Sequence, residues 1–254
     1  MVPMLKNNTA VILSIICFTF LMNGTAFAVK TKLRIAASDW APYTSNKLSG
    51  GGFLTEICTT ALERAGYQCE VDFIPWKRAV KMTKKGKYHC LIGASYTDER
   101  TGYFLYTDYF WETSVHFFAK KGHKLKYSAI DDLCFTRLGI LRGSFYVDRF
   151  KKYKCLTVET VPTVQQNMRK LVAGRLDIII DTFDSVQFYM ANELTDLAGK
   201  IEPIFPSIET DKIYLVISKQ AVDNQAIQRN FDAGIGQIKY DGTYDEILKK
   251  HGKQ

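Results

Sequence analysis

Residues 88–100 combine the residue types that bind an anion. The stretch begins as a short apolar run ending in Gly-Ala-Ser, which predicts a buried strand, and continues as Thr-Asp-Glu-Arg, which predicts a helix start. Backbone N–H groups at a helix start lack partners within the helix, and the hydroxyls of Ser95 and Thr97 can also donate. The guanidinium of Arg100 fits a carboxylate bidentately. We therefore predict that this stretch binds a ligand carboxylate.

Further candidate residues follow the carboxyl ends of neighbouring predicted strands. Residues 33–95 read as strand–helix–strand–helix–strand, which predicts a parallel sheet with right-handed crossovers. Ligands of such sheets bind beyond the carboxyl ends of the strands, where Asp39, Trp40 and Trp76 also lie. This convergence favours a ligand site over the alternative, a surface ion pair between Arg100 and its acidic neighbours.

The chain after residue 120 repeats this pattern of strands and helices. Further strands are predicted at residues 136–141, 155–160, 176–180 and 213–218. Two such units joined by two crossings predict an α/β protein of two lobes, each a mainly parallel sheet flanked by helices. A ligand cleft between the lobes and hinge closure follow from that geometry. The predicted boundaries are 29–112 with 212–254 for lobe 1, and 113–211 for lobe 2.

The second unit has its own candidates at a predicted helix start. Ser144 and Phe145 follow Gly143, so their backbone N–H groups can face an anion. Helix capping alone is the alternative for Ser144. Arg142 either contacts the ligand side chain or faces solvent. Asp181 and Asp184 follow a buried apolar run, and an ordinary helix N-cap is the alternative for both.

The N-terminus has the features of a secretory signal peptide. Lys6 supplies a positive charge, residues 10–22 are apolar, and Ala26-Phe27-Ala28 is a small-x-small cleavage site. The apolar run is too short to span a membrane comfortably. We predict a signal peptide of residues 1–28, cleaved after Ala28, and an exported, soluble mature protein.

Charge and cysteine usage exclude several classes of function. The net charge is +8, but no arginine-rich or RNP-like stretch is present, so we predict no nucleic-acid partner. No Cys-x-x-Cys or zinc spacing occurs, so we predict no metal and no cofactor. Cys134 and Cys155 start predicted strands that should be parallel neighbours, and we predict a disulfide between them. The pairing of the other mature cysteines stays open: Cys58, Cys69 and Cys90.

The order of these motifs resembles a protein family. Gly86-Lys87-Tyr88 precedes the central strand, Thr97-x-Glu99-Arg100 follows it, and an aromatic segment comes at residues 106–110. This pattern resembles the periplasmic solute-binding proteins of polar amino-acid ABC transporters, the bacterial extracellular solute-binding protein family 3. The resemblance covers essentially the whole mature chain. It implies a two-lobed periplasmic-binding-protein fold and a monomer that delivers an amino acid to ABC transporter membrane subunits.

The resemblance also implies roles for individual residues. Arg100 and the backbone at Ser144 hold the ligand carboxylate, and three aromatic residues sandwich its apolar stem: Trp40, Tyr43 and Trp76. Asp39 fits a place near the ligand's side chain or amino group.

A strand-end Asp of the family holds the ligand ammonium. Ungapped alignment puts Thr182 in that slot, and a shift of one residue brings in Asp181. Asp181 is our choice, and Asp184 is the alternative.

Two other functions compete with amino-acid transport. Periplasmic dehydratases that act on arogenate or prephenate have a related fold, and Asp39 or Glu56 could serve as the general acid. The four histidines are scattered without a catalytic arrangement, so we predict no enzyme. A ligand-sensing subunit for a membrane receptor is the other alternative.

Overall fold

The computed structural model describes residue 1 and residues 31–253. Apart from Met1, the predicted signal peptide lies outside the described residues. Among the described residues, no helix has the length and apolar character that crossing a membrane requires.

Within residues 31–253, nine strands form one sheet in the order β2-β1-β3-β9-β5-β8-β6-β7, with β4 paired to β9. The strands are β1 (Lys32–Ala37), β2 (Gln68–Phe73), β3 (Cys90–Ser95), β4 (Phe104–Tyr106), β5 (Trp111–Lys120), β6 (Arg137–Leu141), β7 (Thr157–Val161), β8 (Ile178–Thr182) and β9 (Ile201–Ser218). The α-helices are α2 (Phe53–Arg64), α3 (Trp76–Lys84), α4 (Asp98–Thr101), α5 (Tyr146–Lys151), α6 (Val164–Val172), α7 (Phe183–Asn192), α8 (Asn224–Tyr240) and α9 (Thr243–Lys250). Three 3₁₀ helices, η1 (Ser49–Gly51), η2 (Ile130–Leu133) and η3 (Thr195–Leu197), complete the described elements.

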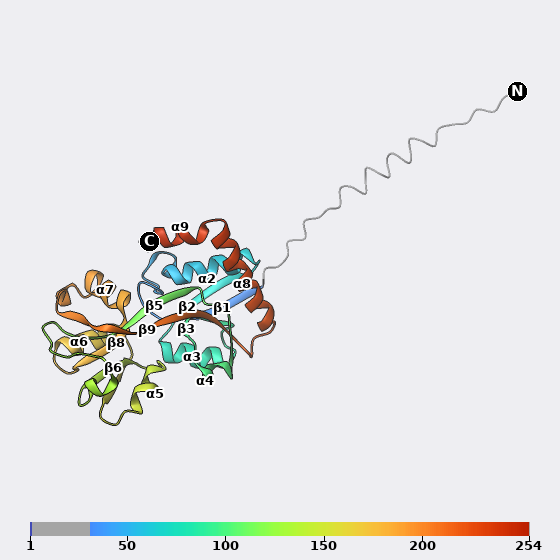
Figure 1. Ribbon diagram of the computed structural model, residues 1–254. Helices are drawn as coiled ribbons and strands as arrows, with labels where there is room; N and C mark the ends of the chain where they lie inside the picture. The colour runs from blue at the N-terminus through green and yellow to red at the C-terminus, as the bar shows by residue number, and fades with distance from the viewer. Residues whose placement is uncertain (2–30, 254) are drawn as a thin grey trace. The chain divides into compact units, whose positions relative to one another are not determined.

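The first half of the sheet contains the parallel strands predicted from residues 33–95. β1 lies between β2 and β3 and pairs with both in parallel. Figure 1 shows α2, α8 and α9 on one face of this half, and α3 and α4 on the other. The helices on the first face bury apolar side chains such as Phe53 and Phe231 against Ile35. The parallel pairing confirms the predicted order of these strands. Each crossover helix covers one face of the sheet.

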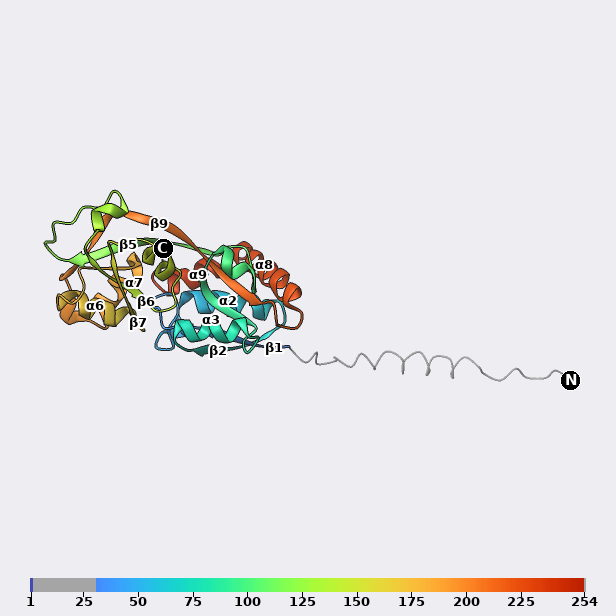
Figure 2. The same ribbon diagram turned by 90° about the horizontal axis from the view of Figure 1, so that it is seen from below.

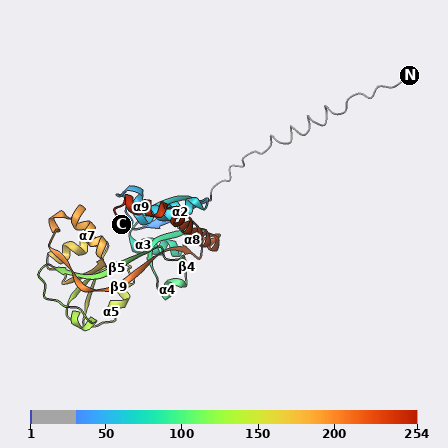
Figure 3. The same cartoon turned by 45° about the horizontal axis from the view of Figure 1, so that its top comes forward.

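The second half repeats the arrangement around β6, which pairs in parallel with β7 and β8. Figure 3 shows α7 on one side of this half and α5 on the other. Successive side chains of a strand point to opposite faces of the sheet. On β5, Phe117 accordingly packs with α5, and Phe118 packs with α6 and α7. A helix at 183–192 was not among the predicted elements.

Two long strands join the halves. β9 pairs antiparallel with β3 and β4 through its final residues and with β5 through its earlier ones. β5 pairs antiparallel with β8 on its other edge. Figure 2 shows β9 running from one half into the other. The predicted return strand at 213–218 is therefore only the end of β9, and the lobe boundaries stay a prediction.

The predicted disulfide is present. Cys134 and Cys155 are bonded, and their Cα atoms lie 4.9 Å apart. They precede β6 and β7, and the backbone pairing of those parallel strands reaches them because the N–H of Phe135 donates to the carbonyl of Cys155. Cys58, Cys69 and Cys90 are free thiols in the structure.

Replacing both Cys134 and Cys155 by alanine should lower the free energy of unfolding by about 3 kcal/mol, because the bond closes a loop of 21 residues and restricts the unfolded chain. Urea unfolding of the double variant and of the wild-type protein, each with and without reductant, measures this loss. A reductant should destabilise only the wild type. Equal stability of the two proteins without reductant would contradict the prediction.

Candidate functional site

A cavity lies between the two halves, beyond the carboxyl ends of β1, β3 and β8. Its lining comes from both halves and from the joining strands: Ser38, Trp40, Trp76, Gly93, Ser95, Arg100, Val115, Ile140, Leu141, Ser144, Phe145, Tyr146, Ile180, Asp181, Thr182 and Asp211. Seven of the predicted site residues are among these: Trp40, Trp76, Ser95, Arg100, Ser144, Phe145 and Asp181. The convergence at strand ends that the sequence predicted is thus observed.

Arg100 projects from α4 toward the cavity. Its side chain is only 5% exposed, and its Nη1 donates to the carbonyl of Ser95 at 3.1 Å. The guanidinium lies 5.6 Å from the ring centre of Trp76, a cation–π contact. The hydroxyl of Thr97 caps α4 by accepting from the N–H of Arg100 at 3.3 Å. Among the described residues Arg100 has no ion-pair partner, so the surface pair with its neighbours is not formed.

Two tryptophans form aromatic walls. Trp40 lines the cavity and stacks on Tyr43, with ring centres 4.1 Å apart. Tyr43 is fully buried behind Trp40, and its hydroxyl lies 2.5 Å from that of Thr113. Tyr43 therefore supports the wall and is not among the lining residues, in contrast to the role given by the resemblance. The sequence alone cannot separate a wall residue from the residue that supports it, because both are large aromatics near a strand end.

Trp76 also connects the two halves. Its indole Nε1 donates to the carbonyl of Gly143 at 3.1 Å. Gly143 has a φ of +87°, and a Cβ there would lie 2.8 Å from the Cβ of Lys77. Only glycine fits such a backbone approach without rearrangement.

The other predicted residues lie around the cavity without lining it. Thr97 and Arg142 line an adjoining groove that shares Arg100 and Ser144 with the cavity. Asp39 is exposed, and it is not among the lining residues.

Asp184 accepts a hydrogen bond from Lys253 Nζ at 2.6 Å and also lies outside the cavity lining. Glu56, the other candidate acid, contacts Lys250 Nζ and His251 Nε2 on and beside α9.

Asp181 reaches the cavity from the end of β8. Its Oδ1 accepts from the backbone N–H of Thr182 at 2.8 Å. Burial raises the pKa of the Asp181 carboxyl to about 6, partly offset by hydrogen bonds from Thr182 and Trp40. The ionised form is therefore costly while no positive group lies beside it.

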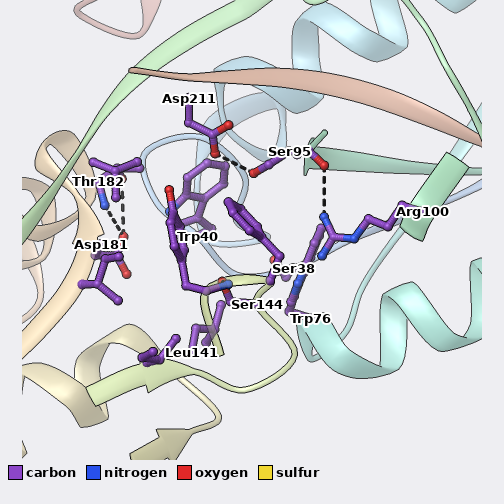
Figure 4. Close-up of a pocket in the computed structure, with 16 residues that line it drawn as sticks. Ser38, Trp40, Trp76, Ser95, Arg100, Leu141, Ser144, Asp181, Thr182 and Asp211 are labelled. Carbon is purple, nitrogen blue, oxygen red and sulfur yellow. Dashed lines mark hydrogen bonds between the residues drawn. The ribbon is translucent and has the colours of Figure 1, made fainter. Parts of the chain in front are cut away.

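Asp211, on β9, is a second cavity carboxylate that the sequence analysis missed. Ser95 Oγ donates to its Oδ2 at 2.5 Å (Figure 4). Burial raises the pKa of Asp211 to about 6, while Ser95 and the charge of Arg100 act in the opposite direction. A predicted strand that began a few residues before 213 would have included Asp211 among the candidate residues.

The lining therefore combines one guanidinium, two carboxylates and the two tryptophans. A guanidinium binds carboxylates, carboxylates bind ammonium groups, and tryptophan faces pack against apolar stems. The arrangement suits a small solute that carries both signs of charge.

Comparison with known proteins agrees with this geometry. The sequence model of the bacterial extracellular solute-binding proteins, family 3, matches residues 33–254. The chain belongs to this family. The lysine/arginine/ornithine-binding periplasmic protein of Escherichia coli (strain K12) is 25% identical over 223 residues, which cover 84% of this chain and 84% of that protein. The family resemblance seen in the sequence is thus confirmed.

Solved structures show the same fold. A substrate-binding protein of an amino-acid ABC transporter from Streptococcus pneumoniae, bound to L-arginine, matches with a TM-score of 0.73 and 19% identity, over 87% of this chain and 94% of that one. A histidine kinase sensor domain with similarity to periplasmic binding proteins matches with a TM-score of 0.76 and 18% identity, over 87% and 96% of the two chains. The predicted periplasmic-binding-protein fold is confirmed.

The raised pKa of Asp211 predicts a stabilising substitution. In the folded, solute-free protein the ionised carboxyl is disfavoured, and this cost is present above about pH 6 and absent below about pH 4. Asp211→Asn removes the charge and keeps an oxygen for Ser95, so it should raise the free energy of unfolding at pH 7 by about 1–3 kcal/mol. Denaturant unfolding should show this gain shrinking from pH 7 to pH 4. A gain that grows toward pH 4 would contradict the assigned pKa shift.

Proposed function

We propose that this protein binds a polar, zwitterionic amino acid in the cavity and delivers it to the membrane subunits of an ABC transporter. The observation that carries the proposal is the buried guanidinium of Arg100 in the same cavity as the carboxylates of Asp181 and Asp211. These buried groups match the two charges that every amino acid carries. The curated relative named above binds lysine, arginine and ornithine by its name, and the streptococcal structure holds L-arginine.

Arg100 is the proposed ligand of the solute carboxylate. Its guanidinium has no ion-pair partner among the described residues and is almost fully buried. Burying a cation without a direct ion pair is costly, so a carboxylate that enters the cavity offsets that cost and gains charge-assisted hydrogen bonds. Ser144, across the cavity, can add its hydroxyl, because its backbone N–H already donates to the carbonyl of Leu141 at 3.1 Å.

The other parts of the solute are matched by the remaining walls. A cavity carboxylate holds the ammonium, with Asp181 the choice from the sequence and Asp211 added by the structure. The faces of Trp40 and Trp76 pack against the apolar stem. The proposed binding requires no cofactor.

Binding is coupled to closure of the two lobes in this proposal. β5 and β9 cross between the halves and serve as the hinge. The hydrogen bond from Trp76 to Gly143 links the two halves, as expected of a closed form. Export by the signal peptide would place the mature, monomeric protein in the periplasm, with no nucleic-acid partner.

The sensory alternative shares the same site and differs only in its partner. The likeness to a histidine kinase sensor domain is a likeness of fold. The dehydratase alternative is less well supported, because Asp39 and Glu56, its candidate acids, are not among the cavity-lining residues. We propose no enzymatic activity.

Calorimetric titration with each of the twenty L-amino acids tests the function. At least one should bind saturably and raise the unfolding temperature, and mass spectrometry should recover it unchanged. Ligand at about 100-fold excess over Kd should add about 2.7 kcal/mol to the free energy of unfolding. Failure to bind any of them would refute the proposal, and conversion of prephenate or arogenate would support the dehydratase instead.

Arg100→Ala should weaken binding of the amino acid found in that titration by about 3–5 kcal/mol, because it leaves a buried carboxylate unpaired. Arg100→Lys should recover little, since a point charge cannot form the bidentate contact.

Arg78→Ala is the matched control for this measurement, because Arg78 is an exposed arginine on α3. This variant should keep wild-type affinity in the same calorimetric assay. Wild-type affinity in Arg100→Ala would refute the carboxylate assignment.

A further inference from the structure

The position of the ammonium site follows from the shape of an amino acid. The α-ammonium and the α-carboxylate are bonded to the same carbon, so they cannot bind at distant points of the cavity. If Arg100 holds the carboxylate, the group that holds the ammonium must lie beside Arg100. The two cavity carboxylates, Asp181 and Asp211, can therefore be told apart by their relation to Arg100.

Asp211 is linked to Arg100 through a single residue. Ser95 Oγ donates to Asp211 Oδ2 at 2.5 Å, and the Ser95 carbonyl accepts from Arg100 Nη1 at 3.1 Å. Figure 4 shows Ser95 between the two side chains. The charge of Arg100 is near enough to lower the pKa of the Asp211 carboxyl against the effect of burial. Asp211 and Arg100 thus form adjacent poles of opposite charge.

Asp181 occupies a different part of the cavity. Its hydrogen-bonding neighbours are Thr182 and Trp40. In Figure 4 it lies with Thr182 on the far side of Trp40 from Arg100. A solute whose carboxylate is bound by Arg100 therefore directs its side chain, rather than its ammonium, toward Asp181.

We propose that Asp211, and not Asp181, holds the α-ammonium of the solute, with Ser95 fixing the carboxylate of Asp211 in place. This inference rests on the proposed function, since it assumes an amino acid in the cavity. An ionised carboxylate accepts several hydrogen bonds, so Asp211 can bind an ammonium while it keeps the bond from Ser95. Asp181 is left to contact the end of the side chain, where it favours a cationic group.

The two carboxylates provide matched variants for a test. Asp211→Asn and Asp181→Asn are isosteric, and each removes a cavity carboxylate whose pKa is raised to about 6. The probes are the tightest-binding of the twenty L-amino acids and the same molecule without its α-amino group. For L-arginine the second probe is 5-guanidinopentanoate. Calorimetry gives the ratio of the two affinities for the wild type and for each variant.

The wild type should prefer the amino acid by about a hundredfold over its deaminated analogue, because a buried charge pair is lost with the ammonium. Asp211→Asn should bring this ratio close to one, and Asp181→Asn should leave it near the wild-type value. The ratio compares two ligands on one protein, so a partly unfolded preparation does not change it. Thermal unfolding confirms that each variant is folded.

The possible failures are distinct. A ratio that collapses in Asp181→Asn and persists in Asp211→Asn would overturn the inference and leave the amino-acid function standing. A ratio that persists in both variants would also overturn it. A wild-type protein that binds none of the twenty amino acids would refute the proposed function, and this inference with it.

Discussion

The pairing of β5 with β9 is the interaction on which the rest of the structure depends. These strands are antiparallel from Trp111 opposite Ile213 to Lys120 opposite Ile201. The end of β9 also pairs with β3 in one half, and the other edge of β5 pairs with β8 in the other half. Backbone groups in the middle of a sheet must be paired, so the ladder holds both halves in a common register. Asp211 projects into the cavity from this ladder, whereas Arg100 and Asp181 come from the two halves that it joins.

Charges removed from water define the cavity. Arg100 is buried without an ion-pair partner among the described residues, and burial raises the pKa values of Asp181 and Asp211. Each of these charged groups is costly in the solute-free protein, and a solute of complementary charges offsets the cost. The proposed selectivity for zwitterions and the expected lower stability of the solute-free protein thus have the same physical origin.

Contacts at the cavity rim explain how residues with similar sequence signals take different roles. Trp40 and Tyr43 are both aromatics after β1, but the stacking of the rings leaves only Trp40 at the cavity surface. Asp181 and Asp184 are separated by two residues, yet α7 begins at Phe183 and turns Asp184 toward Lys253. The helical turn, not the distance along the chain, separates their surroundings.

The sequence by itself determined the elements whose patterns are local. The apolar runs and small strand ends predicted β1, β3, β6 and β8, the placement of Arg100 after β3, and the disulfide between Cys134 and Cys155. Only the tertiary structure decided that Asp211 reaches the cavity. The first part of β9 does not have the sequence pattern of a strand, because it contains Pro203, Pro206 and charged residues and proline cannot donate to a ladder. Its position is set instead by long-range pairing with β5, which no local pattern records.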